Sequence, residues 1–343
     1  MKFPFSRKEL IIVLFSLVIF LLILDIVLSK IFKHSGNQIE KIELYSGEIK
    51  DGFISGMHNF GIKNDWIDEN KNDIKKGDSL KYSFKVKVPK DLPIPLLLNE
   101  ISNSFPPGEI TCVSRESKVN GTTNLSLSSG GFDKLKAEFI YDPEIRRTSC
   151  SFGFLVYGLT KLDPVLQDHL IKVPELFTVV LIPSKESLEI SKRLKTNNKN
   201  YAVILNNEIN DLDYKLVSSY STERLKLSIR SILGNFSDAA AYLYNGNSGF
   251  TGESKFAFIN NEFEKRNVRF IDINKFDLIE ERGTSLDISF EQIVNRANEN
   301  KTELIYISAD NYLKLKPLIL KYMKVGYKFI NPSTVLAEYL KQQ

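Results

Sequence analysis

The sequence predicts an α/β protein: an incomplete (β/α) barrel that follows a small α+β domain and an N-terminal transmembrane helix. Three observations lead to this prediction. A long apolar run opens the chain, strands with one helical stretch among them occupy residues 78–147, and strands that alternate with helices fill residues 148–343. Regular alternation of strands with helices is typical of a parallel sheet, whereas consecutive strands with an added helix are typical of an α+β domain.

The overall composition indicates a globular chain. With 343 residues, of which 43% are hydrophobic, there is room for two domains and a sizeable core. The formal net charge of +4 arises from 46 basic and 42 acidic residues that are interleaved along the chain. Because the basic residues do not cluster, the slight excess is no nucleic-acid footprint, and we expect no nucleic-acid partner.

The N-terminal segment LIIVLFSLVIFLLILDIVL, from Leu10 to Leu28, is apolar apart from one serine and one aspartate. A helix of this length crosses a bilayer core of about 30 Å, so we expect a membrane anchor over residues 10–29. Basic residues in the tail, 1–9, place that end in the cytoplasm. No small-x-small cleavage site follows, which favours an anchor over a signal peptide. We expect a single-pass protein of the inner (cytoplasmic) membrane, with its C-terminal domain in the periplasm or another extracytoplasmic space.

Residues 30–77 are polar and rich in Asn, Lys, Asp and Gly, which predicts a loosely structured linker or stalk, with short strands at most. The pair Met57–His58 and the lone Trp66 have no partner residues at a useful spacing, and we interpret them as part of this linker. The two cysteines, Cys112 and Cys150, lie in strand-like runs. An oxidising compartment would permit a disulfide between them, and two buried thiols are equally compatible with the sequence.

A small α+β domain of ferredoxin-like type is predicted over residues 78–147. SLKYSFKVKV alternates polar and apolar residues as a half-buried strand does, and PIPLLLNEISNSF predicts a short amphipathic helix that begins with proline. GEITCVSRES, NLSLSS and KLKAEFIYD predict further strands. Nothing in this part indicates catalysis, so we expect an accessory module that packs or interacts.

The barrel-like part begins near residue 148. Its strand candidates are SFGFLVY, TVVLIP, YAVIL, AAYLY, RFIDI, LIYIS and KFINP, and its helical stretches include KESLEISKRLKT, TERLKLSIRSIL, ESKFAFINNEFEKR, SFEQIVNRANEN and NYLKLKPLILKYMK. In such barrels the functional groups lie at the carboxyl ends of the strands. The stretch AAYLYNGNSGFT therefore stands out, because small polar residues follow a buried strand there, although the same residues also build ordinary surface turns.

The order of five segments along the chain allows a comparison with known families. These segments are FTVVLIPSKESLEISKRL, YAVILNNE, NGNSGFT, VRFIDINKF and LIYISADNYLKLKPLILKYMKVGYKFINPSTVL. In this order the segment 150–336 resembles the divergent polysaccharide deacetylase family. These are bacterial envelope proteins related to metal-dependent carbohydrate deacetylases. The resemblance implies a variant (β/α) barrel of the polysaccharide-deacetylase type, and the preceding small domain resembles the accessory domain that some members carry.

At most of the family's functional positions this chain has residues that cannot perform the family's chemistry. Two aspartates end the first strand in the family, whereas Tyr157 and Gly158 stand here. The family's His-x-Pro-Met series corresponds to Leu205–Glu208, and its Gly-His pair corresponds to Ser308–Ala309. None of these residues except the glutamate offers a carboxylate or imidazole ligand.

In the loop NGNSGFT, Asn245 stands at the histidine position and Asn247 at the glycine position, while the Ser, Phe and Thr remain. Asp272 is the acidic landmark that survives, and we assign it as a vestigial catalytic candidate.

The small number of histidines limits which metal sites the chain can form, whatever family it resembles. The chain has three histidines, and His169 alone falls in the barrel-like part, where we expect it on the surface of a helix. A His-rich transition-metal site therefore cannot be assembled there. Carboxylates alone could hold Mg²⁺ or Ca²⁺, and Asp272, Asp310 and Glu208 would be the candidates if the strand ends converge.

The sequence thus predicts a membrane-anchored extracytoplasmic pseudoenzyme that binds an envelope glycan or holds envelope proteins, with no cofactor. The alternative is a metal-dependent carbohydrate N- or O-acetyl deacetylase that acts on envelope polysaccharide through altered ligands and needs a divalent metal. No catalytic or metal-binding residue is assigned. Aromatic and amide side chains after the strands suit sugar binding, and the predicted ligand-binding residues are Tyr157, Asn206, Tyr244, Asn245, Asn247 and Ser248.

Overall fold

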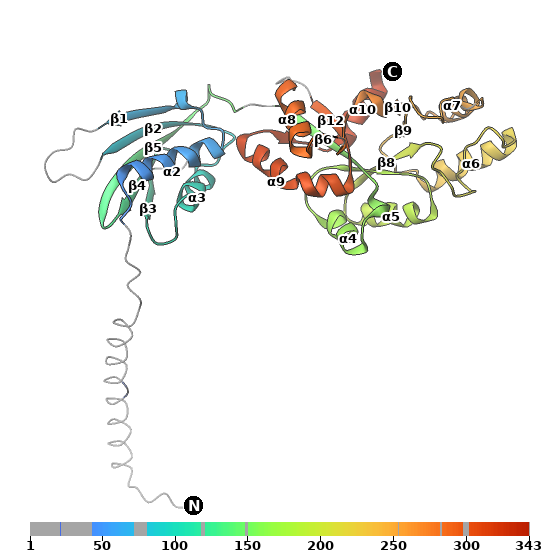
Figure 1. Ribbon diagram of the computed structural model, residues 1–343. Coiled ribbons are helices and arrows are strands. Elements are labelled where there is room, and N and C mark those ends of the chain that lie inside the picture. The colour runs from blue at the N-terminus through green and yellow to red at the C-terminus, as the bar shows by residue number, and fades with distance from the viewer. Residues whose placement is uncertain are drawn as a thin grey trace, which may run out of the picture.

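The computed structural model describes residues 43–71, 81–117, 121–147, 150–252, 254–281, 283–297 and 302–342, together with Leu21. They form two domains, each built on its own sheet (Figure 1). The predicted membrane anchor lies outside the described residues apart from Leu21. Over the ranges given above, no helix is both long enough and apolar enough to cross a bilayer.

The first domain contains a five-stranded mixed sheet in the order β1-β2-β5-β4-β3. The central strands β2 and β5 are parallel, and the other pairs are antiparallel. Two helices, α2 and α3, bury their apolar faces against this sheet. The elements are α2 (Ser46–Asn59), a 3₁₀ turn (Asn64–Trp66), β1 (Ile67–Lys71), β2 (Tyr82–Pro89), α3 (Ile94–Asn103), β3 (Thr111–Glu116), β4 (Thr123–Ser129) and β5 (Phe132–Asp142).

The linker prediction for residues 30–77 is wrong for the described part of that range. Ile49, Phe53 and Met57 lie one turn apart along α2 and are fully buried in the core of the first domain, where Trp66 joins them. The polar composition concealed a helical period, because a few apolar residues spaced by four are enough for one buried face. The Glu48 carboxylate accepts a hydrogen bond from the Tyr45 backbone N–H at 2.8 Å and fixes the helix start.

The ferredoxin-like part of the prediction is also wrong. That arrangement needs a second helix between the last two strands, but in this chain Gly130 and Gly131, both at positive φ, turn β4 directly into β5. The helix α2 that completes the helical layer precedes the sheet instead of interrupting it.

The second domain is built on a wholly parallel sheet in the order β10-β9-β8-β7-β6-β12-β11, with β13 added beside β6. The predicted parallel sheet is therefore present, as an open half-barrel. Its strands are β6 (Ser151–Tyr157), β7 (Thr178–Leu181), β8 (Asn200–Leu205), β9 (Tyr242–Tyr244), β10 (Phe270–Asp272), β11 (Asp277–Ile279), β12 (Thr302–Ser308) and β13 (Lys328–Phe329). Its helices are α4 (Pro164–Lys172), α5 (Lys185–Thr196), α6 (Thr222–Asn235), α7 (Phe256–Glu264), α8 (Leu286–Arg296), α9 (Ala309–Val325) and α10 (Pro332–Gln342).

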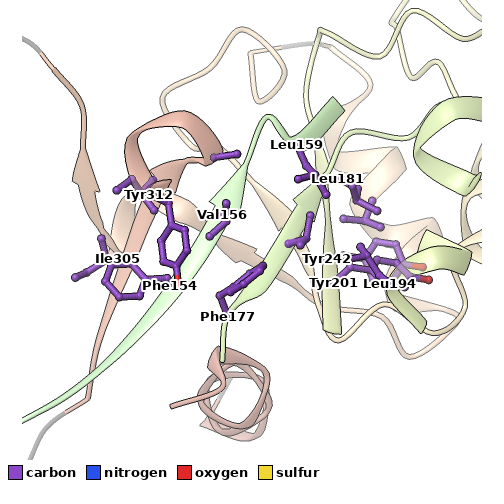
Figure 2. Packing of buried hydrophobic residues seen from close by; sticks show 14 of the residues in the cluster. Phe154, Val156, Leu159, Phe177, Leu181, Leu194, Tyr201, Tyr242, Ile305 and Tyr312 are labelled. Atoms are coloured by element: carbon purple, nitrogen blue, oxygen red, sulfur yellow. The ribbon is translucent and has the colours of Figure 1, made fainter. Parts of the chain in front are cut away.

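The two faces of this sheet have different cores. On the outer face, alternate side chains such as Phe154, Val156 and Ile305 pack against helices α4 to α9, and Figure 2 shows this cluster with Phe177 and Tyr312. On the inner face the strands contribute small or branched residues, which pack against α10. Helix α10 was not predicted from the sequence, although its buried Leu336 packs on the inner face.

Gly153 allows α10 to approach the sheet. A Cβ atom at this position would lie 3.1 Å from Cγ of Pro332, the first residue of α10, and 2.8 Å from a methyl group of Leu304. A glycine in the middle of a central strand costs conformational entropy, and close approach of another element is the usual compensation.

Arg147, in the connection between the domains, joins them. Its Nε and Nη2 donate to Oδ2 of Asp91 at 2.8 and 2.6 Å, and its Nη1 donates to the carbonyl oxygens of Phe60 at 3.2 Å and Lys324 at 2.7 Å. Phe60 and Asp91 belong to the first domain and Lys324 lies in α9 of the second. Lys324 adds an ion pair of 3.2 Å to Glu100 in α3. A charged, mostly buried guanidinium with these partners holds the two domains in one orientation.

The cysteines are far apart in the fold. Cys112 lies in the edge strand β3 of the first domain, whereas Cys150 is buried in the second, where its thiol donates to the Ala297 carbonyl at 3.4 Å. The two thiols are not joined in a disulfide. Burial raises the pKa of the Cys112 thiol, so this side chain is less nucleophilic than an exposed cysteine.

We predict that Arg147→Ala lowers the free energy of unfolding by about 2–3 kcal/mol, because it leaves two carbonyls and a carboxylate at the interface without their charged donor. It should also uncouple the domains. Urea unfolding of the purified full-length chain in detergent would show this: the fluorescence of Trp66, which reports the first domain, should then change at a lower urea concentration than the circular dichroism of the whole chain.

Lys192→Ala is the control, since Lys192 forms an exposed ion pair of 2.7 Å with Glu189 on one helix. Its effect should stay within about 0.5 kcal/mol. Coincident transitions and unchanged stability in Arg147→Ala would contradict the role of Arg147 as the bridge between domains.

Candidate functional site

A cavity of about 750 Å³ opens on the inner face of the parallel sheet, at the carboxyl ends of its strands. This is the position at which parallel α/β sheets and barrels place their functional groups. A larger hollow of about 1010 Å³ lies between α7, the edge strand β10 and its neighbour β9, and Tyr244 is the one predicted site residue that lines it. We treat the first cavity as the candidate site because side chains from several strand ends converge on it.

The period of the strands decides which predicted residues face the cavity. Successive side chains of a strand point to opposite faces, so alternate positions share a face. We call the positions that point to the inner face of the sheet the inner parity and the others the outer parity. Tyr157, Asn206 and Asn245 have the inner parity at the ends of β6, β8 and β9. These three residues line the cavity together with Asn247 and Ser248. The structure thus brings five of the six predicted ligand-binding residues to one place.

Tyr244 is the exception. It falls on the outer parity of β9, where its ring packs against Phe256 and Phe270 with centroid distances of 5.8 and 6.2 Å. Burial, followed by the charge of Asp272, raises the pKa of its phenol. Strand alternation along the run AAYLYN already indicates, from the sequence, that Tyr244 and Asn245 point to opposite faces of the sheet.

A stacked pair of tyrosines forms one wall of the cavity. The rings of Tyr157 and Tyr306, from the neighbouring strands β6 and β12, lie 4.5 Å apart between centroids at an angle of 22°. The Tyr157 hydroxyl donates to Oε1 of Glu280, just after β11, at 3.4 Å. Burial raises the pKa of the Tyr306 phenol, and Tyr157, Glu208 and Glu280 raise it further, so this hydroxyl stays protonated at physiological pH.

The loop after β9 forms a compact turn. The Asn245 side-chain oxygen accepts from the Asn247 N–H at 2.9 Å, and its carbonyl accepts from the Ser248 N–H and hydroxyl at 3.0 and 2.7 Å. Thr251 donates its hydroxyl to the carbonyls of Gly246 and Ser248, both at 2.9 Å, and Phe250 is fully buried beneath. Asn and Ser side chains that bind their own backbone define the shape of this loop.

Asp272, the vestigial catalytic candidate, holds this loop to β10. Its Oδ1 accepts from the backbone N–H groups of Gly246 and Asn274, each at 3.0 Å, and from the Asn274 amide at 2.8 Å. The same amide donates to Oδ1 of Asn245 at 3.0 Å. Asp272 does not line the cavity. Its carboxylate stabilises the loop that carries the site.

The candidate carboxylate ligands do not come together. Glu208 lines the cavity, Asp272 is engaged in the loop, and the exposed Asp310 pairs with Lys314 at 2.9 Å on the outside of α9. In the part of the chain that the structure describes, no three His, Cys, Asp or Glu side chains form a group that could hold a metal ion. His169 is exposed on α4, which confirms the prediction for this residue.

Two important residues of the cavity, Tyr306 and Glu280, were not predicted from the sequence. Tyr306 precedes the end of β12 by two residues and has the inner parity, so strand alternation could have found it. Glu280 follows β11, a strand of three residues whose pattern is too short to predict. The register of β11 beside β12 is what places Glu280 near the tyrosine pair.

Some solved structures have a distant similarity to this chain. No family model matches it, and no curated protein sequence matches it. The uncharacterised protein ATU2773 from Agrobacterium tumefaciens C58 aligns with 13% identity and a TM-score of 0.36, over 57% of this chain and 91% of its own. A mutant of BA3943, described as a CE4 family pseudoenzyme with restored enzymatic activity, aligns with 12% identity and a TM-score of 0.35, over 70% of this chain and 97% of its own.

PdaA of Bacillus subtilis, a family 4 carbohydrate esterase, aligns with 12% identity and a TM-score of 0.33, over 56% of this chain and 82% of its own. The protein therefore has a distant structural similarity to CE4 polysaccharide deacetylases, one of which is a pseudoenzyme. At these identities the likeness concerns the fold alone.

We predict that Gly246→Ala disrupts the loop, because the added Cβ would overlap with the Asp272 carboxylate. The stability should fall by about 1–3 kcal/mol, and the backbone amides of residues 245–251 should exchange with deuterium faster. Gly252→Ala is the matched control, since the nearest atom to its Cβ, the Gly249 carbonyl oxygen, lies 3.5 Å away. Equal exchange in both variants would show that Asp272 does not hold the loop.

Proposed function

We propose that this protein is a catalytically inactive, deacetylase-like module that binds saccharide at the carboxyl ends of its parallel strands. We further propose that its N-terminal segment, residues 10–29, anchors it in the bacterial cytoplasmic membrane and that the saccharide belongs to the cell envelope. One observation carries the proposal: a cavity of about 750 Å³ is walled by a stacked tyrosine pair and bordered by asparagine side chains.

The chemistry of the cavity suits a sugar ring. Aromatic faces offer apolar contact to the C–H face of a pyranose, and amide and hydroxyl groups match its hydroxyls as donors and acceptors. Tyr157 and Tyr306 supply the aromatic wall, while Asn206, Asn245 and Asn247 supply amides from two adjacent strands. The loop that presents the last two is already fixed by its own hydrogen bonds, which lowers the entropy cost of binding.

The same residues argue for binding without hydrolysis. A deacetylase of this kind needs a carboxylate base together with side chains that hold a cation. Asp272, the acidic position that survives, already accepts three hydrogen bonds and lies outside the cavity lining. Glu208 and Glu280 remain inside the cavity, so an altered metal-dependent deacetylase is the second candidate function.

We predict that Tyr157→Ala weakens the binding of hexosamine oligosaccharides by about tenfold, because the loss of one stacking ring costs about 1.4 kcal/mol. Tyr157→Phe keeps the ring and should retain most of the affinity. Titration calorimetry on the full-length chain in detergent, with oligosaccharides of glucosamine and of N-acetylglucosamine, measures both. Tyr45→Ala is the control, since Tyr45 is 79% exposed and lies in the first domain.

Two results would overturn the proposal. Release of acetate from the acetylated oligosaccharide in the presence of Zn²⁺, Mn²⁺ or Mg²⁺, lost in Glu208→Ala, would make the protein an enzyme. Absence of binding to either oligosaccharide would favour a scaffold for envelope proteins, which should tolerate Tyr157→Ala.

A further inference from the structure

We propose that the cavity selects saccharides with a free, protonated amine, such as de-N-acetylated hexosamines, over their N-acetylated forms. This inference rests on the proposed saccharide binding and names the class of sugar. The observation behind it is the placement of two carboxylates, Glu208 and Glu280, on either side of the tyrosine pair.

The two carboxylates reach the cavity from different parts of the sheet. Glu208 follows β8, where its backbone N–H donates to the Asn206 side chain at 3.1 Å and turns the chain toward the cavity. Glu280 follows the edge strand β11, and its Oε1 accepts from the Tyr157 hydroxyl at 3.4 Å. Strands β7, β6 and β12 lie between β8 and β11 in the sheet. The carboxylates therefore flank the tyrosines, which come from β6 and β12.

Glu208 and Glu280 line the same cavity, and both act on the Tyr306 hydroxyl. After burial and Tyr157, the charges of Glu208 and Glu280 both raise the pKa of the Tyr306 phenol. Two groups that influence the same hydroxyl create a negative potential beside it. Glu280 is half-buried, which weakens the screening of its charge by water, whereas Glu208 is exposed at the rim of the cavity. The third charged side chain of the lining, Lys161, is exposed on the 3₁₀ turn after β6.

A protonated amino sugar complements this arrangement. Its ring can stack on a tyrosine, its hydroxyls can meet the asparagines, and its ammonium group can pair with the carboxylates and the adjacent aromatic face. An acetamido group is neutral and bulkier, so it would displace water from the glutamates without compensating their charge. The cavity should therefore discriminate by the amine more than by the rest of the ring.

The test is titration calorimetry of the full-length chain in detergent with oligosaccharides of glucosamine and of N-acetylglucosamine of equal length. The glucosamine form should bind at least tenfold more tightly at low ionic strength, and added salt should reduce this preference. Glu208→Gln and Glu280→Gln keep the shape of each side chain. Each should weaken the glucosamine form severalfold, whereas the acetylated form should bind at least as tightly as before, because a neutral glutamine is less costly to desolvate.

Lys161→Gln is the matched control because it removes the opposite charge from the same lining. It should strengthen the binding of the glucosamine form at low ionic strength, because it removes a charge that repels the ammonium group. Circular dichroism and thermal unfolding establish that each variant is folded. Equal affinity for both sugars, or tighter binding of the acetylated form, would overturn this inference and leave the proposed saccharide binding intact. Absence of binding to both would overturn the two proposals together.

Discussion

The alternation of side chains along the parallel strands is the constraint on which this structure depends. Both faces of the sheet are buried, so every strand must supply apolar residues on both parities. The outer parity carries the large aromatic residues that helices cover, and the inner parity carries the smaller residues against which α10 packs. Past the apolar part of β6, β8 and β9 the inner parity continues into Tyr157, Asn206 and Asn245, and these residues line the cavity.

The loop after β9 shows how a carboxylate beside a cavity can serve to hold a loop in place. Asp272 satisfies three hydrogen-bond donors, and Gly246 is the residue without a Cβ that lets the loop approach it. The hydrogen-bonding capacity of this carboxylate oxygen is used by protein donors in the folded state. The carboxylate therefore positions neighbouring residues and not a reacting water. Asn245 is positioned beside this contact, because its side-chain oxygen accepts a hydrogen bond from the Asn274 amide.

The first domain and the half-barrel share an interface built on Arg147. The guanidinium satisfies two backbone carbonyls, one at the end of α2 and one in α9, and ties both to Asp91. Figure 1 shows α9 on the side of the parallel sheet that faces the first domain. The helix α2 contacts α9 directly, so the first domain stabilises the outer layer of the half-barrel.

The sequence by itself determined the parallel sheet, the strand ends where polar residues collect, and the histidine shortage, because each follows from composition or local periodicity. Only the tertiary structure decided the rest. Helix α2 and Trp66 pack into the core of the first domain, α10 covers the inner face of the parallel sheet, and Glu280 reaches Tyr157 through the pairing of β11 with β12. These outcomes depend on contacts between segments distant in the chain, which no local pattern encodes.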